Sequence, residues 1–241
     1  MQVIPVEIPK EIEFDDNISD LICKSMDLYD GDILVISQKI ISKQEGRIVN
    51  LSSVTPSLLA KGISSEYDKD PCIVELILSE SKKIVRMESG KIIVETKNGF
   101  ICANAGIDES NVKNGFATLL PINSDHSAEN ICKQIWKSQK KEIAVVISDT
   151  FGRPFRMGQT DCAIGISGFN PILDYAGTLD NFGNVLHVTA IAIADEICGA
   201  AELLMKKTTK CPVVVIRGFQ FKKENSSISE ILRPEKDDLF R

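Results

Sequence analysis

The sequence has few of the residues from which most metal and redox sites are built. It has only two histidines, His126 and His187, and its seven cysteines are scattered without a single C-x-x-C pair. A zinc site with cysteine and histidine ligands needs such residues at close spacing, so we do not expect one. Most of the cysteines have apolar neighbours, which favours reduced thiols in a protein core, and we expect a cytoplasmic protein.

Long apolar runs and an excess of basic residues are also absent. No segment approaches the roughly 18 apolar residues of a membrane-spanning helix, and the N-terminus has neither the basic start nor the apolar core of a signal peptide. The 28 basic residues are outnumbered by 34 acidic ones, which gives a net charge of −6. A general nucleic-acid binder needs a basic face to neutralise phosphates, so we expect neither nucleic acid nor a membrane as a partner. A single nucleotide in a locally basic pocket remains compatible with this charge.

Helical and strand-like patterns alternate irregularly, and neither G-x-G-x-x-G nor a Walker A motif occurs. Helices are predicted over 17–28, 54–62, 68–81, 126–141 and 195–207. Strands are predicted over 29–37, 91–106 (two runs), 142–148, 162–167, 185–194 and 211–219. We therefore predict an α+β fold with mixed sheets, hairpins and packed helices, and not a Rossmann fold. No strong linker divides the chain, so we expect one domain over 1–241, with two intertwined subdomains as the alternative.

Several elements have local start or turn signals. Asn17 is a predicted N-cap, and Thr55-Pro56 and Asp70-Pro71 each place a capping side chain before a proline at the first helical position. Asn98-Gly99 between two strand-like runs is the strongest short signal for a β-hairpin.

Three polar clusters follow apolar strands, and the first is ISQKIISKQEGR. It contains Gln38, Lys39, Lys43, Glu45 and Arg47. Three cations and an amide just beyond a buried strand are suited to binding a polyphosphate. The alternative interpretation is a solvated basic edge.

The second cluster is NAGIDESN, where Asp108, Glu109 and Asn111 follow a tight turn. Carboxylates at a strand end favour hard cations such as Mg²⁺ or Mn²⁺, which prefer oxygen ligands. The alternative interpretation is a helix N-cap or an Asx turn.

The third cluster is VVISDTFGRPFRMGQTD, in which Asp149-Thr150 is predicted to end a buried strand. A carboxylate and a hydroxyl there suit a metal ion and a phosphate. Arg153 and Arg156 suit bidentate binding of an anion. The alternative is a structural turn whose arginines pair with surface acids.

Acids for a divalent ion, lysines for phosphates and arginines for a second anion together indicate nucleotide-dependent group transfer, in which positioning and charge neutralisation dominate catalysis. No nucleophile elbow and no histidine beside a nucleophile occurs, so hydrolase and redox functions have less support.

The motifs resemble those of the coenzyme F420-0:L-glutamate ligases, a family of γ-glutamyl ligases. The resemblance covers nearly the whole chain, through GDILVISQKIISKQEGR, NAGIDESN, ISDTFGRPFRMGQTD, AIGISG, LDYAGTLDNFGN, IADEICGAAELLM and PVVVIRGF, in the same order and spacing. It implies a family-specific α+β fold, a homodimer with its sites in a groove near the interface, and GTP-dependent ligation with Mn²⁺ or Mg²⁺ and K⁺. GTP would phosphorylate the carboxylate of coenzyme F420-0, and the amine of L-glutamate would attack the acyl phosphate.

The resemblance also implies roles for individual residues. Those implied to hold metal are Asp108, Asp149 and Thr150. Those implied to contact the nucleotide are Ile8, Pro9, Lys10, Glu11, Gln38, Lys39, Lys43 and Asn111. For catalysis we expect Asp149, together with Arg153 and Arg156 of the GRPxR motif, which we assign to the acidic tail of the substrate on the basis of their charge.

One segment departs from the family pattern. Where family members have a glycine-rich loop, this chain has MKKTTKCP, residues 205–212, and Lys207 takes a place where some members supply a metal-binding acid. A lysine cannot ligate a hard cation, and without glycine the backbone approaches a nucleotide less easily. A second metal site and strict guanine specificity therefore stay open. A ligase for a different carboxylate and amino acid, or a non-catalytic nucleotide-binding paralogue, is the alternative function.

Overall fold

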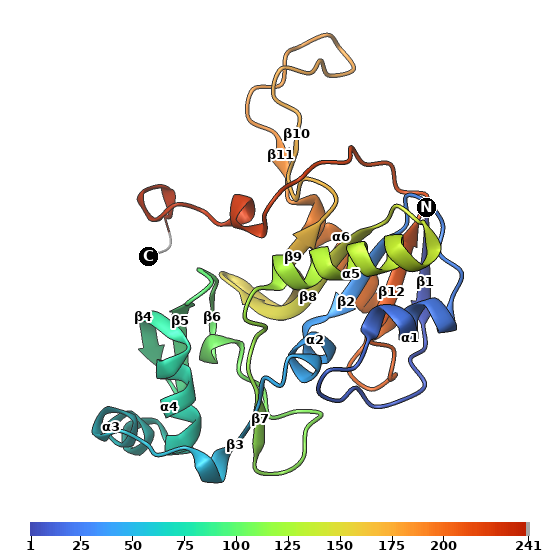
Figure 1. Cartoon of the computed structure of the whole chain (residues 1–241). Helices are drawn as coiled ribbons and strands as arrows, with labels where there is room; N and C mark the ends of the chain where they lie inside the picture. Colours follow the sequence, from blue (N-terminus) through green and yellow to red (C-terminus); the bar gives the residue numbers. More distant parts are fainter. Residues whose placement is uncertain (240–241) are drawn as a thin grey trace.

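The computed structural model describes residues 1–239, so the predicted span of 1–241 includes two residues outside this description. A five-stranded sheet with the order β1-β12-β2-β8-β9 forms the centre of the larger half of the molecule (Figure 1). Its strands are β1 (Gln2–Val6), β12 (Val213–Arg217), β2 (Ile33–Ser37), β8 (Ala144–Arg153) and β9 (Arg156–Ser167). Only β2 and β8 pair in parallel. With the other sheets and the helices, the sheet confirms the α+β prediction.

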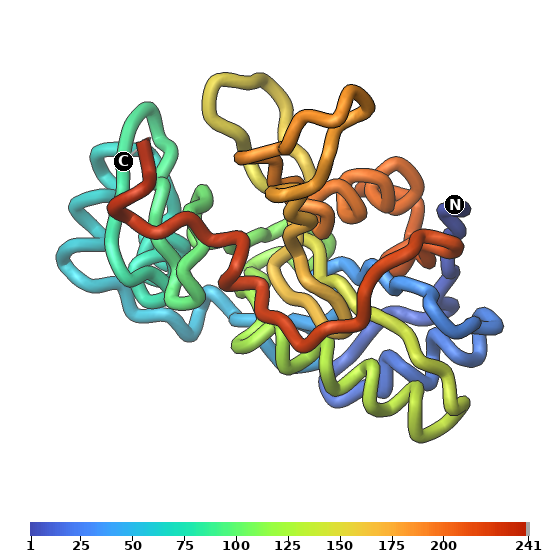
Figure 2. Tube along the Cα trace, turned by 90° about the horizontal axis from the view of Figure 1, so that it is seen from above, coloured from blue at the N-terminus to red at the C-terminus, as the bar shows by residue number. Residues whose placement is uncertain are grey.

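Helices cover both faces of this sheet. The helices α1 (Ile18–Ser25) and α5 (Ser124–Gln139) lie on one face, and α6 (Ile193–Met205) lies on the other (Figures 1 and 2). The apolar runs of β2, β8 and β12 are buried because both faces are covered, as expected for central strands. The short helix α2 (Gln38–Gln44) follows β2 directly, so the lysine-rich segment of the first polar cluster is helical and begins where a central strand ends.

A second hydrophobic core lies in the smaller half of the molecule, which the chain enters after α2 and leaves before α5. Its buried residues all come from the range 51–119, although Phe100 of that range belongs to the core around the five-stranded sheet. Its elements are β3 (Ile48–Asn50), η1 (Leu51–Ser53), α3 (Leu58–Tyr67), α4 (Pro71–Ser79), β4 (Ser81–Glu88), β5 (Lys91–Thr96), β6 (Ile101–Ala103), η2 (Asn104–Gly106) and β7 (Phe116–Thr118). Figure 2 shows this half beside the main sheet, with the last residues of the chain running back across to it. That C-terminal segment contains η3 (Ile228–Ile231) and η4 (Glu235–Asp237).

Two segments project from the main sheet on the same side (Figure 2). One is the far end of the β8–β9 hairpin. The other is the loop between β10 (Leu173–Asp174) and β11 (Ala190–Ile191), which form a two-stranded ladder. Both carry apolar side chains in solvent: Met157 is 98%, Phe182 92% and Val188 92% exposed. Exposed apolar side chains of this kind are a feature of surfaces that a partner covers.

The local signals of the sequence are confirmed at some elements and wrong at others. Asn17 and Asp70 are N-caps, and Asn98-Gly99 joins the antiparallel strands β5 and β6. The prediction of Thr55 as a cap, with Pro56 in the first turn, is wrong. Ser57 caps α3 instead, with its hydroxyl accepting from the amide of Ala60.

The predicted strand over 185–194 is also wrong. Only Ala190–Ile191 is in a strand, and α6 already begins at Ile193. The apolar residues before it have no sheet against which to pack, and apolar pattern alone does not make a strand without such a surface.

The predicted ends of the strands at the third cluster need a larger correction. Asp149-Thr150 does not end a strand, because β8 continues to Arg153 and returns as β9 from Arg156. The third polar cluster is therefore a long β-hairpin rather than a turn.

The thiols agree with the sequence. All seven cysteines are free. No helix within residues 1–239 has both the length and the apolar character needed to cross a membrane.

Candidate functional site

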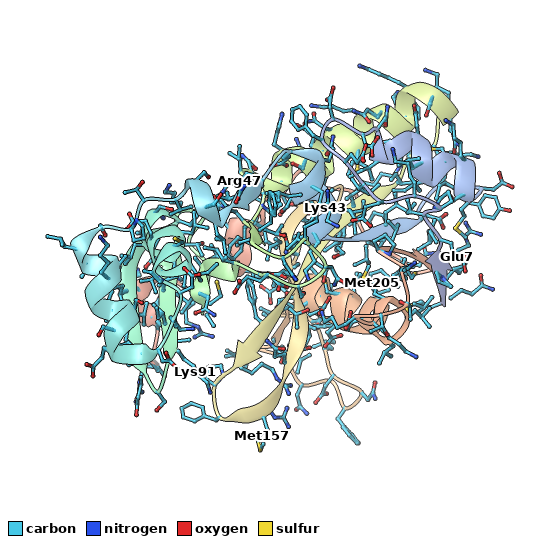
Figure 3. The ribbon with its side chains drawn as sticks, turned by 90° about the horizontal axis from the view of Figure 1, so that it is seen from below. Glu7, Lys43, Arg47, Lys91, Met157 and Met205 are labelled. Atoms are coloured by element: carbon cyan, nitrogen blue, oxygen red, sulfur yellow. The ribbon has the colours of Figure 1, made fainter. Side chains whose placement is uncertain are left out.

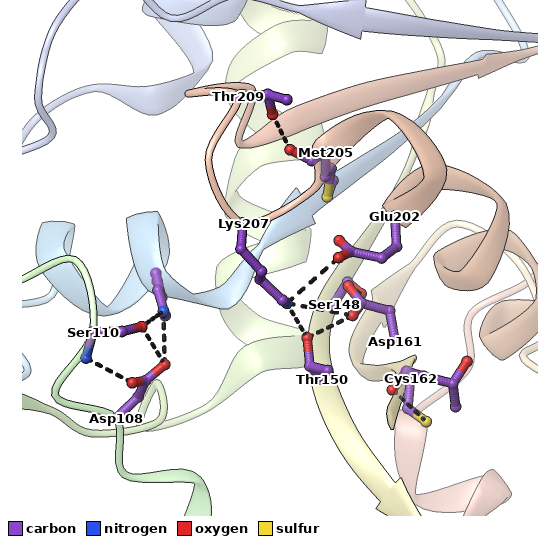
Figure 4. A network of polar contacts seen from close by, with 12 residues as sticks. Asp108, Ser110, Ser148, Thr150, Asp161, Cys162, Glu202, Met205, Lys207 and Thr209 are labelled. Carbon is purple, nitrogen blue, oxygen red and sulfur yellow. Dashed lines mark hydrogen bonds and ion pairs between the residues drawn. The ribbon is translucent and has the colours of Figure 1, made fainter. Parts of the chain in front are cut away.

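The hairpin of β8 and β9 presents polar side chains on both of its faces. Thr150 and Asp161 are direct cross-strand partners, so their side chains share a face, and Ser148 lies on that face two residues earlier. Asp149 lies between Ser148 and Thr150 in the strand, so its side chain leaves on the opposite face. Figure 4 shows two separate polar networks in this region, one on the hairpin and one around Asp108.

The first group, the Asp161 cluster, consists of Ser148, Thr150, Asp161, Glu202 and Lys207 (Figure 4). The carboxylate of Asp161 is 5% exposed and accepts from Ser148 Oγ at 2.9 Å and from Thr150 Oγ1 at 2.6 Å. Lys207 Nζ donates to Thr150 Oγ1 and lies 3.8 Å from Asp161 Oδ1 and 3.6 Å from Glu202 Oε1. The loop that follows α6 thus places an ammonium beside two carboxylates.

The second group, the Asp108 cluster, consists of Lys39, Asp108 and Ser110. Asp108 Oδ1 accepts from the backbone amide of Ser110 at 2.7 Å, which is an Asx turn, so the structural alternative for this residue is present. Asp108 Oδ2 also lies 2.6 Å from Lys39 Nζ, which brings the first and second polar clusters of the sequence together. The lysine and the hydrogen bonds from Ser110 lower the pKa of Asp108 and outweigh its partial burial, which acts in the opposite direction.

Asp149 is the most perturbed acid of the site. Burial is the main cause that raises its pKa, to about 7, and the nearby carboxylates of Asp161 and Asp108 add to the rise. A hydrogen bond from the Thr150 amide and the charge of Lys207 oppose it. Within residues 1–239 no lysine, arginine or histidine forms an ion pair with Asp149. A cation bound beside this desolvated carboxyl group would stabilise its ionised form and lower its pKa.

The oxygen donors suit Mg²⁺ or Mn²⁺ as these ions usually bind. Among the described residues no three His, Cys, Asp or Glu side chains are arranged as a ready metal site. Mg²⁺ is commonly held by one or two carboxylates and completes its shell with water and substrate phosphates, so a pair of acids is sufficient. Asp108 and Asp149 fit that pattern. Thr150 Oγ1, the third predicted ligand, is already engaged by Lys207.

The residues predicted to bind nucleotide are brought together only in part. Lys43 is buried and forms an ion pair with Glu11, so the N-terminal turn does meet α2. Gln38 is 1% exposed, and its side-chain oxygen accepts from Ser42 Oγ within the same helix at 2.8 Å. This hydrogen bond stabilises α2 and occupies the side-chain oxygen of Gln38.

The other predicted nucleotide positions have different surroundings. Ile8 is buried in the core. Pro9 is exposed, and Lys10 is exposed and pairs with Asp16 at 2.8 Å. Asn111 is exposed with a φ of 56°.

Arg47, which the sequence placed among the possible phosphate ligands, has a structural role. Arg47 Nη2 lies 2.6 Å from Glu80 Oε2, and Arg47 Nε donates to the carbonyl of Leu120 at 2.9 Å. It therefore connects α2 to the second core. Figure 3 shows it apart from Lys43, toward the smaller half of the molecule. The basic residues of the first polar cluster therefore do not lie together: Lys39 and Lys43 are on α2, whereas Arg47 binds residues of the smaller half.

Arg153 and Arg156 lie at the tip of the hairpin and not beside the carboxylates. They are cross-strand partners at its closed end and are exposed, and Arg153 Nη2 donates to the carbonyl of Met157 at 3.1 Å. Figure 3 shows Met157 at this outer tip, away from the rest of the molecule. Within residues 1–239 neither arginine forms an ion pair, so the alternative interpretation, in which they pair with surface acids, does not hold for the described residues.

Asp161, Ser148 and Glu202 also belong to this site, although no motif in the sequence predicted a role for them. A hairpin prediction for the third cluster would have found Asp161, because folding the strand at Pro154-Phe155 places it opposite Thr150. Neither residue of that turn is glycine or asparagine, so the usual signal was missing. Glu202 offered no local signal, since it reaches the site from the last turn of α6.

Comparisons with known proteins identify the family. Residues 6–218 match the family model described as F420-0:Gamma-glutamyl ligase. A protein of Methanothermobacter thermautotrophicus named coenzyme F420:L-glutamate ligase is 45% identical over 218 residues, which cover 89% of this chain and 86% of that protein. Proteins of the same name from Methanocaldococcus jannaschii and Methanosarcina mazei are 43% and 41% identical and cover 93% and 100% of this chain, and 90% and 95% of their own lengths.

Proposed function

The chain belongs to the F420-0:gamma-glutamyl ligase family, and we propose that it joins L-glutamate to the carboxylate tail of coenzyme F420-0 through a γ-glutamyl bond. The observation that carries this proposal is the ion pair of Asp108 and Lys39, which lies near enough to the buried Asp149 for the two carboxyl groups to interact, together with a match that spans most of the chain. These groups match the needs of phosphoryl and acyl transfer: acids for a metal ion and a cation for phosphate.

In the proposed reaction GTP is the co-substrate. The carboxylate of coenzyme F420-0 attacks the γ-phosphorus of GTP, the bond to the β-phosphate oxygen breaks, and GDP leaves with that electron pair. The uncharged amine of L-glutamate then attacks the acyl phosphate, and inorganic phosphate leaves as the amide forms. The amine gives up a proton in this second step. Repetition on the new terminal carboxylate extends the chain.

The residues of the chain provide positioning and charge. Lys39 and Lys43 lie on α2 at the carboxyl end of a central strand, where their ammonium groups can move from Asp108 and Glu11 to phosphate oxygens. Ile8, Pro9, Lys10, Glu11, Gln38 and Asn111 are the remaining proposed nucleotide positions. Arg153 and Arg156, on the projecting hairpin, are proposed to bind the acidic tail of the substrate.

Asp108 and Asp149 are the residues proposed to hold Mn²⁺ or Mg²⁺, and Thr150 is a further proposed ligand that would first have to be released by Lys207. When bound, the ion would neutralise negative charge on the transferring phosphoryl group. K⁺ is proposed as a further cation. The chain is also proposed to act as a homodimer in the cytoplasm, in which the two apolar projections of one copy cover part of the other.

Mass spectrometry tests the proposed function directly. The chain is incubated with coenzyme F420-0, L-glutamate, GTP and Mn²⁺, and products heavier by one glutamate are sought. Omission of GTP, of Mn²⁺ or of glutamate should each abolish them. If a folded sample with bound Mn²⁺ forms no such product, the proposed acceptor is wrong.

The glycine-free loop favours a second candidate, a ligase of this family for another carboxylate and amino acid. Lys207 on this loop already occupies the oxygen of a proposed metal ligand. A panel of acceptors, scored by GTP-dependent release of phosphate, separates the two candidates. Tight binding of GTP without phosphate release from any mixture would instead indicate a non-catalytic paralogue.

A further inference from the structure

Lys207 makes a set of contacts that a bound cation would make. Its ammonium touches a hydroxyl oxygen, that of Thr150, and lies within 4 Å of the carboxylates of Asp161 and Glu202. All three partners are oxygen atoms, and two carry negative charge. An ammonium has three donors and no lone pair, so it can only act toward them as a positive charge and a donor.

The hydrogen bonds fix the direction of the Thr150 hydroxyl. Its single hydrogen goes to Asp161 Oδ1 at 2.6 Å, because a carboxylate can only accept. Lys207 must therefore donate to a lone pair of Thr150 Oγ1. A metal ion bound to this hydroxyl would use the same lone pairs and approach from the same side. The ammonium of Lys207 and a metal ion at Thr150 Oγ1 are therefore mutually exclusive in this arrangement.

The carboxylates of Asp161 and Glu202 lie beside Lys207 and are stabilised by its positive charge. The side chain of Asp161, on β9, is 5% exposed, and that of Glu202, on α6, is 27% exposed. Within residues 1–239 Lys207 is the one cation within 4.0 Å of either carboxylate. Uncompensated carboxylates at low exposure are costly, so removal of the lysine leaves a cluster that attracts another cation.

The loop that carries Lys207 is held in place by hydrogen bonds to the carbonyl groups of α6. Thr209 Oγ1 donates to the carbonyl of Met205, and the amide of Lys206 donates to the carbonyl of Glu202, so the loop closes directly on the end of α6 (Figure 4). The neighbouring Lys206 makes no side-chain ion pair in residues 1–239, which shows that position on the loop, and not lysine content, brings Lys207 to the acids.

We propose that Lys207 is a tethered cation that takes the place of one metal or alkali ion between Thr150, Asp161 and Glu202. The chain then binds one cation fewer than the same site would with a neutral residue at this position. This inference rests on the proposed function only in assigning the neighbouring acids Asp108 and Asp149 to a divalent ion.

The test counts cations bound to the full-length chain. Free Mn²⁺ is measured by electron paramagnetic resonance during a titration of the native protein, Lys207→Gln and the matched control Lys206→Gln. We expect Lys207→Gln to bind one more Mn²⁺ per chain than the native protein, and Lys206→Gln to bind the native number. Lys207→Glu adds an oxygen ligand and should bind the extra ion at least tenfold more tightly than Lys207→Gln.

A second arm distinguishes a divalent from an alkali ion. Melting temperatures of the same variants are compared in KCl and in choline chloride without divalent metal. If the position is an alkali site, Lys207→Gln gains a stabilisation by K⁺ that the native protein lacks, and this also supports the proposal.

The proposal is overturned if Lys207→Gln binds the native number of Mn²⁺ ions and its melting temperature shows no new dependence on K⁺. A loss of GTP affinity in Lys207→Gln with an unchanged ion count would likewise overturn it, because Lys207 would then be a phosphate ligand. Absence of all Mn²⁺ binding by the native protein, with or without GTP, would contradict the proposed function instead, and the comparison between variants would still decide the role of Lys207.

Discussion

At the scale of single residues, Asp149 shows how burial prepares a carboxyl group for a cation. Its ordinary pKa of 3.8 is raised to about 7. Between these values the folded chain keeps a proton that the unfolded chain has released, so the free energy of unfolding falls as the pH rises from about 4 to about 7. Above that range the penalty is complete, and a bound divalent ion would relieve it.

The Asp149→Asn variant tests this directly. We expect it to lose ligase turnover, because the amide removes a charged oxygen ligand. Its melting temperature should be nearest to that of the native protein at about pH 4, and the difference in favour of the variant should grow up to about pH 7, because only the native protein has a titrating carboxyl group at this position. Excess Mn²⁺ at pH 8 should stabilise the native protein more than the variant. Near-native turnover would remove Asp149 from the metal site.

A second residue-scale prediction concerns Asp32 and Arg217, far from the site. Asp32 is 1% exposed, and its two carboxylate oxygens accept from Arg217 Nε at 2.9 Å and Nη2 at 2.7 Å. The guanidinium also lies 3.9 Å from the centre of the Tyr29 ring. We expect Arg217→Ala to lower the free energy of unfolding by about 3–5 kcal/mol, because it leaves a buried carboxylate without its partner.

Denaturant titration measures this loss, and Lys222→Ala is the control. Lys222 has an 86% exposed side chain and lies 3.8 Å from Glu224, so removing it should change the free energy of unfolding by less than about 1 kcal/mol. Equal effects of the two substitutions would contradict the importance of burial at Asp32.

At the scale of elements, the contact between β9 and α5 leaves no room for a side chain. A Cβ atom at Gly165 would lie 2.4 Å from Ser124 Cβ and 2.5 Å from the backbone carbon of the same residue, in the first turn of α5. We expect Gly165→Ala to lower the free energy of unfolding by roughly 1–3 kcal/mol or more, since α5 must move away from the sheet. Gly62→Ala, in α3 with nothing within 4 Å, should instead raise it by roughly 0.5–1 kcal/mol. Thermal or denaturant unfolding of the pair separates packing from helix propensity, and two effects of the same sign would contradict this account.

Elements were predictable where a local signal and the tertiary structure agree. Asn17 and Asp70 directly precede their helices and cap them. At α3 two capping residues compete, and the choice depends on a distant contact, the backbone amide of Ser57 donating to Glu75 Oε2 at 2.8 Å. Residues 185–189 have a strand-like pattern, but they lie in a projecting loop with no strand beside most of them.

The candidate site was predictable to a similar degree. Asp108, Lys39 and Asp149 stood out because each was predicted to follow or end an apolar strand, and the structure brings the first two into contact. The position of Asp161 in the site follows from its cross-strand pairing with Thr150, and that of Glu202 from where α6 ends. Neither feature can be predicted from the local sequence around these residues. The tip position of Arg153 and Arg156 likewise follows from the length of the hairpin, which the sequence analysis ended too early.

At the scale of the whole molecule, the two projecting segments are not explained by the packing of one chain. The hairpin tip and the loop between β10 and β11 lie on the same side of the main sheet (Figure 2). They carry Met157, Phe182 and Val188, each more than nine-tenths exposed. Exposed apolar groups on projections from the same side are expected at a surface that a second copy covers, and the arginines proposed for the substrate lie on one of these projections.

This arrangement predicts a homodimer in which each copy contributes its projections to the other. Light scattering during size-exclusion chromatography should give twice the chain mass of 26.5 kDa for the native protein. The double variant Phe182→Ser and Val188→Ser should shift the mass toward that of one chain and reduce turnover in parallel, since both side chains are 92% exposed in a single chain and have no packing there to lose. Leu58→Ser is the control, because Leu58 is 87% exposed on α3 at the far end of the second core and should leave the mass unchanged. A native protein that has the mass of one chain at every concentration, or a double variant that remains dimeric, would show that the projections do not form the interface.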